Sequence, residues 1–595
     1  LAGQVKQQTP ILVILGNPPY SGHSTNTGDW IRGLIETYKQ VDGKPLGEKN
    51  PKWLQDDYVK FLRFAQWKIE QAGCGVVGMI TNHGYLDNPT FRGMRRSLMQ
   101  TFDDIYVLDL HGNALKKETC PDGSPDKNVF DIRPGVAIAF FIKRGGKTKS
   151  NAVVRHAELY GTRESKYTWL DKHDAKKTRW RKLTPRTDSY LFVPRDESSL
   201  RMYERFLSIP DIFPLNSVGI VTARDNLTIQ WSAQDVWHTV NLFAKSNPEL
   251  ARRSYQLGKD ARDWKVTLAQ QDIIDSGPAR DKVVPILYRP FDVRHTYYTG
   301  RSRGFLCMPR PEVMQHMLTG DNLALCVGRQ GQVVGAGEWN LCFCSKTIED
   351  FNLFYRGGNV NFPLYLYPEP KPEQSKKDKA GVGRYVSMML FEPKELYGAR
   401  HPNLNAAIVD ALAAAYGKAP TPESIFYYVY AMLYAPTYRT KYAEFLKMDF
   451  PRIPFTSDAK LFKRLAALGE KLVALHLLKS PDLDPPTCRF EGDGNNRVEK
   501  DRKTGLRYDA NKKRVYINAE QYFAPVPEAI WNYQIGGYQV CEKWLKDRRE
   551  RRLELDDIRA YCRIVTALEK TIELQDEIDA IYPTAEKQTV AVPEA

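Results

Sequence analysis

The sharpest chemical signal in the chain is the run Asn17-Pro18-Pro19-Tyr20, which directly follows an apolar segment. The Asn17 side-chain oxygen can accept a hydrogen bond from an exocyclic amino group. The Pro18 carbonyl, whose direction the Pro-Pro pair fixes, can accept the second hydrogen. Two acceptors draw the amine out of conjugation with its ring and raise the lone-pair density on nitrogen, while Tyr20 can lie against a flat base. The run favours group transfer to an amine, and the alternative is an ordinary strand-ending turn.

This run needs a sheet edge to position it. Continuous apolar runs alternate with helical periodicity in the first 148 residues, which predicts an α/β layer with a largely parallel sheet. Ligands of such sheets bind outside the carboxyl ends of the strands, where Asn17 is expected. The expected strands are residues 11–15, 75–80, 105–110 and 136–142, and the expected helices are residues 57–71 and 91–101.

The rest of the chain changes character. Residues 149–370 are rich in aromatic and β-branched residues with frequent Pro and Gly, which predicts a mixed α+β region. Residues 371–384 are polar and charged, as in a linker or exposed loop. Residues 385–595 are expected to be mainly helical.

Composition narrows the class of protein. The 86 basic and 71 acidic residues leave a formal charge of +15, which suits a polyanionic partner and equally suits simple solubility. No apolar run approaches the roughly 18 residues that span a bilayer, so no membrane contact is expected. The nine cysteines, without a CxxC pair, indicate free thiols in a reducing compartment. HExxH is absent as well, so we expect no metal site.

Strand–NPPY resembles the catalytic motif of amino-group methyltransferases that use S-adenosylmethionine. Later segments resemble the adenine-N6 DNA branch in the same order: 57–62, 91–96 and 128–138. This resemblance implies that S-adenosylmethionine is the cofactor, that double-stranded DNA with a flipped adenine is the substrate, and that Asn17, Pro18, Pro19 and Tyr20 are catalytic. It also implies that Tyr20 and Phe130 bind the base, although Phe130 could instead be core packing at a strand start.

Downstream blocks narrow the resemblance to single-polypeptide (type ISP) restriction-modification enzymes. The blocks are residues 289–298, 361–368, 425–428, 449–455 and 531–538. In that family one chain carries nuclease, ATP-driven translocase, methyltransferase and target-recognition domains. The implied fold is α/β: a partial Rossmann-like methyltransferase core (1–148), a mixed α+β target-recognition region and a helical C-terminal part. The implied location is the prokaryotic cytoplasm.

The chain departs from that family upstream of Asn17. The glycine-rich loop and the acidic residue that hold the methyl donor are expected before Leu1, so the chain reads as a fragment with an incomplete cofactor site. An alternative is therefore a non-catalytic DNA-binding specificity module. A weaker alternative is an RNA or protein-glutamine methyltransferase, against which the length of the chain after the α/β region argues.

Base and phosphate contacts to DNA come mainly from Arg, Lys, Asn and Gln. One group of arginines interleaves with tyrosines, and a second short segment has the same character. Each of these side chains could equally be structural or solvated. The candidate DNA-binding residues are Arg289, Arg294, Arg301, Arg303, Arg329 and Gln330.

Overall fold

The computed structural model describes residues 10–20, 22, 24–46, 51–114, 118–146, 152–186, 189–194, 199–329, 338–368, 400–501 and 503–591. The expected linker at 371–384 and the candidate Gln330 lie outside these residues. The chain forms two compact units: residues 1–197 with 334–337, and residues 198–333 with 338–595.

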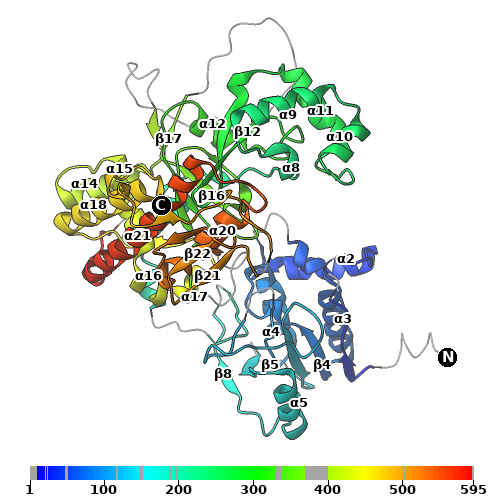
Figure 1. The fold of residues 1–595 in the computed structure, drawn as a ribbon. Helices are drawn as coiled ribbons and strands as arrows, with labels where there is room; N and C mark the ends of the chain where they lie inside the picture. Colours follow the sequence, from blue (N-terminus) through cyan, green and yellow to red (C-terminus); the bar gives the residue numbers. More distant parts are fainter. Residues whose placement is uncertain are drawn as a thin grey trace, which may run out of the picture. The chain divides into compact units, whose positions relative to one another are not determined.

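A six-stranded sheet organises the first unit, in the order β1-β4-β6-β5-β7-β8. Strands β4, β5 and β8 are labelled in Figure 1. Its strands are β1 (Val13–Gly16), β4 (Gly75–Asn82), β6 (Val136–Lys143), β5 (Asp104–Asp109), β7 (Val153–Glu158) and β8 (Arg181–Leu183). The helices are α2 (Asp29–Glu36), α3 (Asp57–Ala72), α4 (Arg92–Thr101) and α5 (Arg163–Lys172). The sheet therefore continues past residue 148, because β7 and β8 extend it.

The expectation of a largely parallel sheet is wrong. Pairs β1–β4 and β5–β7 are parallel, but β6 runs antiparallel to both of its neighbours and β8 runs antiparallel to β7. Continuous apolar runs report burial on both faces and carry no information about strand direction. A buried central strand such as β6 has the same apolar sequence pattern whether it runs parallel or antiparallel to its neighbours.

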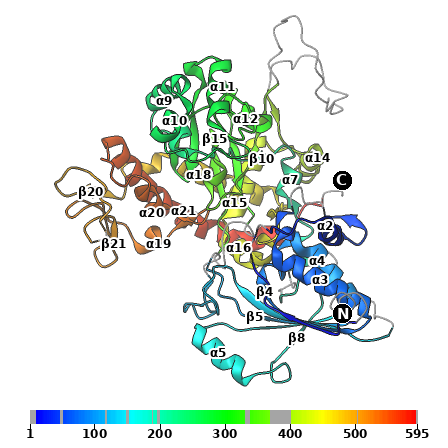
Figure 2. The ribbon, with the colours of Figure 1, turned by 90° about the vertical axis from the view of Figure 1, so that its right-hand side faces the viewer.

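Alternation along the strands builds one core on each face of this sheet. Figure 2 shows α3 and α4 on one face and α5 on the other. Ala137, Ala139 and Phe141 of β6 pack with the apolar stripe of α3 and with α4, whereas Ile138 packs on the opposite face near α5. Tyr58, Leu62, Ala65 and Ile69 of α3 recur at helical spacing and are buried. Helix α3 ends at Ala72, and the C-cap residue Gly73 adopts the left-handed conformation at φ 79°.

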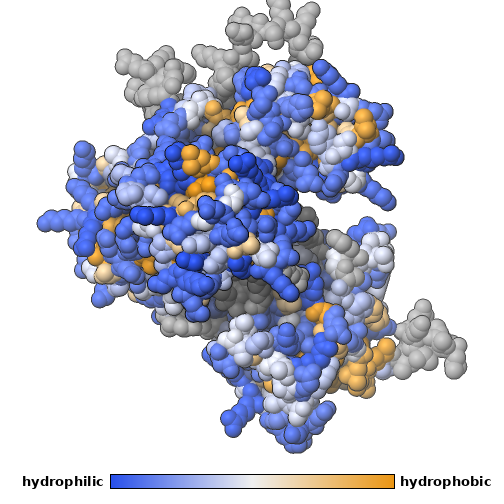
Figure 3. Space-filling model, viewed as in Figure 1, coloured by the Kyte–Doolittle hydropathy of each residue, from blue (hydrophilic) through white to orange (hydrophobic). Residues whose placement is uncertain are grey.

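One edge of this sheet, among the described residues, is the short strand β1, and the other is β8. The β1 side chains Val13 and Leu15 are 61% and 73% exposed, and Leu12 just before β1 is 49% exposed. Trp30 and Phe61 of the neighbouring helices are also exposed, and apolar side chains are visible on the surface of this unit (Figure 3).

The second unit combines small sheets with helices. Its larger sheets are β10-β16-β13-β14, β12-β11-β15 and β20-β23-β22-β21. The strands are β10 (Ser217–Val218), β16 (Val360–Pro363), β13 (Ala324–Val327), β14 (Cys342–Ser345), β12 (Asp292–Tyr297), β11 (Val283–Arg289), β15 (Ile348–Glu349), β20 (Arg489–Glu491), β23 (Tyr522–Ala524), β22 (Arg514–Tyr516) and β21 (Arg507–Asp509).

Helix α15 lies at the centre of the helical part of this unit. Every residue from Tyr428 to Tyr434 is buried, so the helix is covered on all sides. A Cβ at Gly469 of α18 would lie 1.9 Å from the Tyr427 carbonyl oxygen, so only glycine allows this close approach of α18 to α15. The principal helices are α8 (Asp225–Thr228), α9 (Ala233–Lys245), α10 (Pro248–Ser254), α11 (Val266–Ser276), α12 (Pro311–Leu318), α14 (Ala406–Tyr416), α15 (Pro422–Tyr434), α18 (Ala459–His476), α20 (Val540–Lys546) and α21 (Leu555–Lys587).

No helix in the described parts of the chain combines the length and the apolar character that a membrane crossing requires. All nine cysteines are free, and eight of them are buried.

Candidate functional site

Four strands of the first unit end on one edge of the sheet. Strands β1, β4, β5 and β7 share one direction, because each of β4 and β5 is antiparallel to β6. The run that begins at Asn17 follows β1, His83 follows β4, and His111 lies two residues after β5. Asn17, His83 and His111 thus lie at the edge where open α/β sheets bind ligands.

The motif after β1 is held by its own tyrosine. The Tyr20 hydroxyl donates a hydrogen bond to Asn17 Oδ1 at 3.0 Å, and the Tyr20 ring packs edge-on against Tyr58 at 6.1 Å. Burial raises the pKa of Tyr20 to about 12, so the phenol is a neutral donor at pH 7. Asn17 and Pro19 are exposed and Pro18 is buried. The Asn17 oxygen has two lone pairs, so one acceptor position stays available beside Tyr20.

Phe130 lies in the long connection between β5 and β6, and its side chain is half-buried. Asn128 shapes this connection: its Nδ2 donates to the carbonyls of Gly112 (3.1 Å) and Pro134 (2.7 Å), and its Oδ1 accepts from the Phe130 amide (2.8 Å). Tyr20 and Phe130 pack against the same small apolar cluster, which includes Leu108. The structure therefore brings both expected base-binding rings to one cluster, although they are far apart in the sequence.

A buried ion pair, which the sequence reading missed, clamps the same connection. Lys166 Nζ of α5 lies 2.8 Å from Asp126 Oδ1, and both side chains are fully buried. Lys166 also donates to the carbonyls of Leu110 and Lys127, and Asp126 accepts from the amides of Gly112 and Gly161. Gly112 adopts φ 78°, and a Cβ there would lie 2.4 Å from Asn128 Cα.

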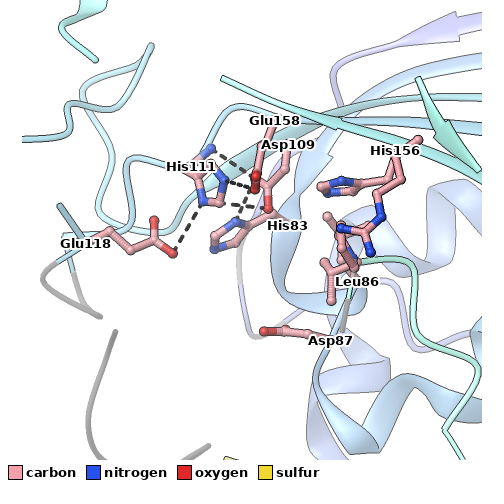
Figure 4. Close-up of a pocket in the computed structure, with 11 residues that line it drawn as sticks. His83, Leu86, Asp87, Asp109, His111, Glu118, His156 and Glu158 are labelled. Carbon is pink, nitrogen blue, oxygen red and sulfur yellow. Dashed lines mark hydrogen bonds and ion pairs between the residues drawn. The ribbon is translucent and has the colours of Figure 1, made fainter. Parts of the chain in front are cut away.

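A second feature missed by the sequence reading is a cavity of about 240 Å³, which we call the histidine cavity. It is lined by His83, Leu86, Asp87, Asp109, His111, Glu118, His156, Glu158, Arg181, Val193 and Pro194 (Figure 4). His83 Nδ1 lies 3.0 Å from Asp109 Oδ1, and the His111 ring stacks on Tyr160 at 3.9 Å. The position of both histidines just after strand ends was the signal that could have identified this cavity.

Charges in the histidine cavity are strongly coupled. Burial lowers the pKa of His111, but the carboxylates of Glu118, Glu158 and Asp109 outweigh it and raise the value to about 10. Burial raises the pKa of Asp109, yet the neighbouring His83 and His111 hold it below its ordinary value. Three carboxylates of the cavity therefore favour the charged form of His111.

The candidate DNA-binding arginines of the second unit fall into two groups. Arg289 and Arg294 are only 8% and 9% exposed. Arg289 pairs with Asp350 at 2.9 Å, and Arg294 pairs with Asp292 at 2.8 Å. These two guanidinium groups are held mainly by internal partners.

The other three candidates are exposed. The side chains of Arg301 and Arg303 are 54% and 65% exposed and lie beside the surface residues Asp275 and Asp263. Arg329 is exposed and lies over the Phe450 ring at 5.4 Å. These three side chains are accessible to a partner.

The second unit also contains a cavity of about 470 Å³, which we call the amide-lined cavity. Its lining includes the side chains of Asn226, Gln230, Gln256, Trp231 and Arg294. Trp231 is contacted through its ring by the guanidinium groups of three arginines: Arg294 (3.9 Å), Arg548 (4.8 Å) and Arg551 (3.9 Å). The sequence reading missed these amides because they are dispersed: Asn226 lies on α8, whereas Gln230 and Gln256 lie in the segments after α8 and α10.

A comparison with protein-family models matches residues 211–577 to the Type ISP C-terminal specificity domain. A search of curated proteins finds no match.

Three solved structures share the fold. The first, "ATP-dependent Type ISP restriction-modification enzyme LlaBIII bound to DNA", has a TM-score of 0.72 and 21% identity over 96% of this chain. The DrdV–DNA complex has a TM-score of 0.69 and 23% identity over 99% of this chain. A nuclease-deletion mutant of the Type ISP enzyme LlaGI with a DNA substrate mimic has a TM-score of 0.69 and 21% identity over 97%. This chain spans 38%, 58% and 53% of those chains, respectively.

Proposed function

Because the chain belongs to the Type ISP C-terminal specificity domain family, we propose that it supplies two parts of a site-specific DNA adenine-N6 methyltransferase. One part reads the target sequence, and the other holds the flipped adenine. The observation that carries the second part is the exposed Asn17 carboxamide, which stands at the carboxyl edge of the sheet with Tyr20 beside it. That combination fits an aromatic amine better than any other substrate class.

In this proposal the chain's own residues bind and orient the amine. Asn17 Oδ1 and the Pro18 carbonyl accept its two hydrogens, which concentrates the nitrogen lone pair on the side facing the donor. The neutral phenol of Tyr20 keeps Asn17 in place through its hydrogen bond, and its ring offers one face to the base. Phe130, in the connection anchored by Asn128, offers the second face.

S-adenosylmethionine would supply an electrophilic methyl group to that nitrogen. The described residues fit the acceptor side of the reaction, but they include no glycine-rich turn after a strand that precedes β1. The apolar edge formed by Leu12, Val13 and Leu15 suits a further covering layer of protein. In this proposal the described residues serve the acceptor side of the reaction, and the donor site and the nuclease and ATP-dependent translocase partners belong to other protein.

Target reading is assigned to the second unit. The carboxamides of the amide-lined cavity can pair with adenine edges, and exposed Arg301, Arg303 and Arg329 can contact phosphates. Arg289 and Arg294 then act mainly as internal supports, since both are buried and ion-paired.

Asn17→Ala in the full-length protein tests the proposal. Transfer of a labelled methyl group from S-adenosylmethionine to duplex DNA should fall at least about 100-fold, the scale for removing one positioned electrostatic partner. DNA affinity should stay within about twofold, because one exposed carboxamide adds little to a charge-dominated interface. Asn511→Ala, an exposed asparagine of the second unit, is the matched control. Unchanged methyl transfer in Asn17→Ala would eliminate the assignment.

A second candidate is a DNA-binding specificity module without methyltransferase activity. It is favoured by one observation: the family match covers 211–577, which leaves residues 1–197 of the first unit unmatched. In that case the full-length protein would bind one duplex sequence, would transfer no methyl group, and Asn17→Ala would change neither property.

A further inference from the structure

Three side chains of the first unit converge on one point in the histidine cavity. His83 comes from the end of β4, His111 from the end of β5, and Glu118 from the connection that follows β5. One ligand atom from each of the three lies within 4.8 Å of the others (Figure 4). The ligand atoms of a bound zinc ion lie roughly 2.0–2.2 Å from the metal, so these three side chains would move closer together on binding.

The outer nitrogens of both imidazoles already face carboxylates. His83 Nδ1 lies 3.0 Å from Asp109 Oδ1, and His111 Nε2 lies 3.4 Å from Glu158 Oε2. Metal-binding histidines usually carry a carboxylate or carbonyl partner on the nitrogen that does not bind the metal, because this partner fixes the tautomer and the ring orientation. The nitrogens left to face inward are His83 Nε2 and His111 Nδ1.

The inward-facing atoms have partners that an ion could replace. The Asn113 side-chain nitrogen lies 3.0 Å from His83 Nε2, and Glu118 Oε1 lies 3.8 Å from His111 Nδ1. Asn113 can turn its amide away, while its backbone amide keeps Glu118 in place through a hydrogen bond of 2.8 Å. The donor set is then two imidazoles and one carboxylate.

An independent observation points to a ligand in this cavity. His156, only 2% exposed, lines it, and His156 Nε2 has no hydrogen-bond partner among the described residues. A buried nitrogen without a partner is costly, and a water bound to a metal ion would satisfy it. The cavity volume of about 240 Å³ leaves room for an ion and its waters.

We propose that His83, His111 and Glu118 bind one divalent transition-metal ion of the zinc class, with Asp109 and Glu158 as positioning residues. Two imidazoles and a carboxylate suit zinc rather than the all-oxygen sites of magnesium and calcium. The ion ties the start of the β5–β6 connection to the end of β4. Its role is structural: it fixes the connection that also carries Asn128 and Phe130.

The test uses the full chain after removal of metals with a chelator, and zinc alone is the probe. Calorimetric titration and elemental analysis after gel filtration should give one zinc per chain, and the melting temperature should rise with zinc concentration. His83→Gln and Glu118→Gln should lose this binding. Asp109→Asn should weaken it by about 10- to 100-fold, the scale for removing an outer partner of a metal-bound imidazole. His173→Gln, in the same unit but outside the cavity, should bind zinc like the wild type.

Three results would overturn the proposal. The first is absence of stoichiometric zinc in the wild type, and the second is zinc binding that Glu118→Gln and His83→Gln leave unchanged. The third is thiolate-to-metal charge-transfer absorption with cobalt as the probe, which would assign the ion to the free cysteines. Melting curves of the metal-free variants establish that they fold, so a loss of binding in a folded Glu118→Gln variant supports the site.

Discussion

At the scale of single residues, the first unit presents an exposed acceptor next to aromatic rings. Asn17 is held by the Tyr20 hydroxyl, and Tyr20 shares an apolar cluster with Phe130. Asn17 and Tyr20 belong to one short run, whereas Phe130 comes from a distant segment of the chain. The contribution of Phe130 to base binding can therefore be measured separately from that of the run.

Phe130→Ala should weaken base binding. Stacking of a base on an aromatic ring is worth about 1–3 kcal/mol, so methyl transfer should fall roughly 5- to 150-fold. Phe130→Tyr keeps the ring and should retain most activity. Fluorescence of 2-aminopurine at the target position reports extrusion of the base. If Phe130→Ala leaves both the fluorescence and the rate unchanged, Phe130 is core packing rather than a wall of the base pocket.

Glu349 of β15 gives a pH-dependent prediction in the second unit. It is fully buried, Asn361 donates a hydrogen bond to it, and burial raises its pKa to about 8. The folded state thus holds a proton that the unfolded state releases above about pH 4.3. The contribution of Glu349 to the free energy of unfolding should be fully present below that pH. It should fall by roughly 1.4 kcal/mol per pH unit as pH rises towards 8.

Glu349→Gln is the matched variant, since it keeps the shape and cannot ionise. The free energy of unfolding, measured by denaturant titration across this pH range, should depend less on pH than in the wild type. Exposed Glu528→Gln should behave like the wild type. Parallel pH profiles for the wild type and Glu349→Gln would show that Glu349 ionises normally.

At the scale of elements, the β5–β6 connection is the part of the first unit on which the proposed site depends. Helix α5 anchors it through Lys166, and Asn128 braces it across Gly112. The connection is long, but it is held by a buried ion pair and by backbone hydrogen bonds. We therefore expect substitutions of Lys166 or Asn128 to alter the conformation of this connection, although neither residue is close to Asn17 in the sequence.

Lys166→Met should destabilise this unit. It leaves the fully buried Asp126 carboxylate without its cation, and breaking one partner of such a pair costs about 3–5 kcal/mol. Exposed Lys172→Met on the same helix is the control. Thermal unfolding followed by hydrogen exchange should locate the loss in residues 110–135. Equal melting temperatures for the two variants would contradict the claim that the Lys166–Asp126 ion pair stabilises this unit.

At the scale of the whole molecule, charge and division into units matter most. The chain carries a formal charge of +15, and the family match at residues 211–577 covers most of the second unit. Sequence reading and base holding are thus assigned to units that fold around separate cores. Changes in the second unit should alter where the protein binds, and changes in the first should alter what happens to the adenine.

Arg303→Ala and Gln230→Ala should separate two kinds of DNA contact. Losing the exposed Arg303 should weaken binding to every duplex and reduce the salt slope by about one phosphate, near 0.9 in log–log units. Losing the Gln230 amide should reduce the difference in binding free energy between the cognate duplex and a duplex mismatched at one base pair by about 1–3 kcal/mol. It should leave the salt slope unchanged. Anisotropy titrations at several salt concentrations with cognate and mismatched duplexes measure both. Identical effects of the two variants would argue against this division.

The sequence by itself determined the elements and the motif. Apolar runs and helical spacing predicted β1, β4, β5, β6, α3 and α4 close to their observed bounds, because burial periodicity is written locally in the chain. The placement of Asn17 after a strand followed from the same local pattern. The specificity region was also recognisable, because its blocks are long and sequence-specific.

Only the tertiary structure decided the direction of the strands and which distant residues contact each other. An apolar strand carries no sign of its direction, so the reversal of β6 was not predictable. Arg294 was a candidate DNA contact until the fold placed Asp547, more than 250 residues away, beside it. His83 and His111 carry no ligand spacing in the sequence, and parallel strands bring them to one edge. Pairings of this kind depend on through-space distance, which local periodicity does not encode.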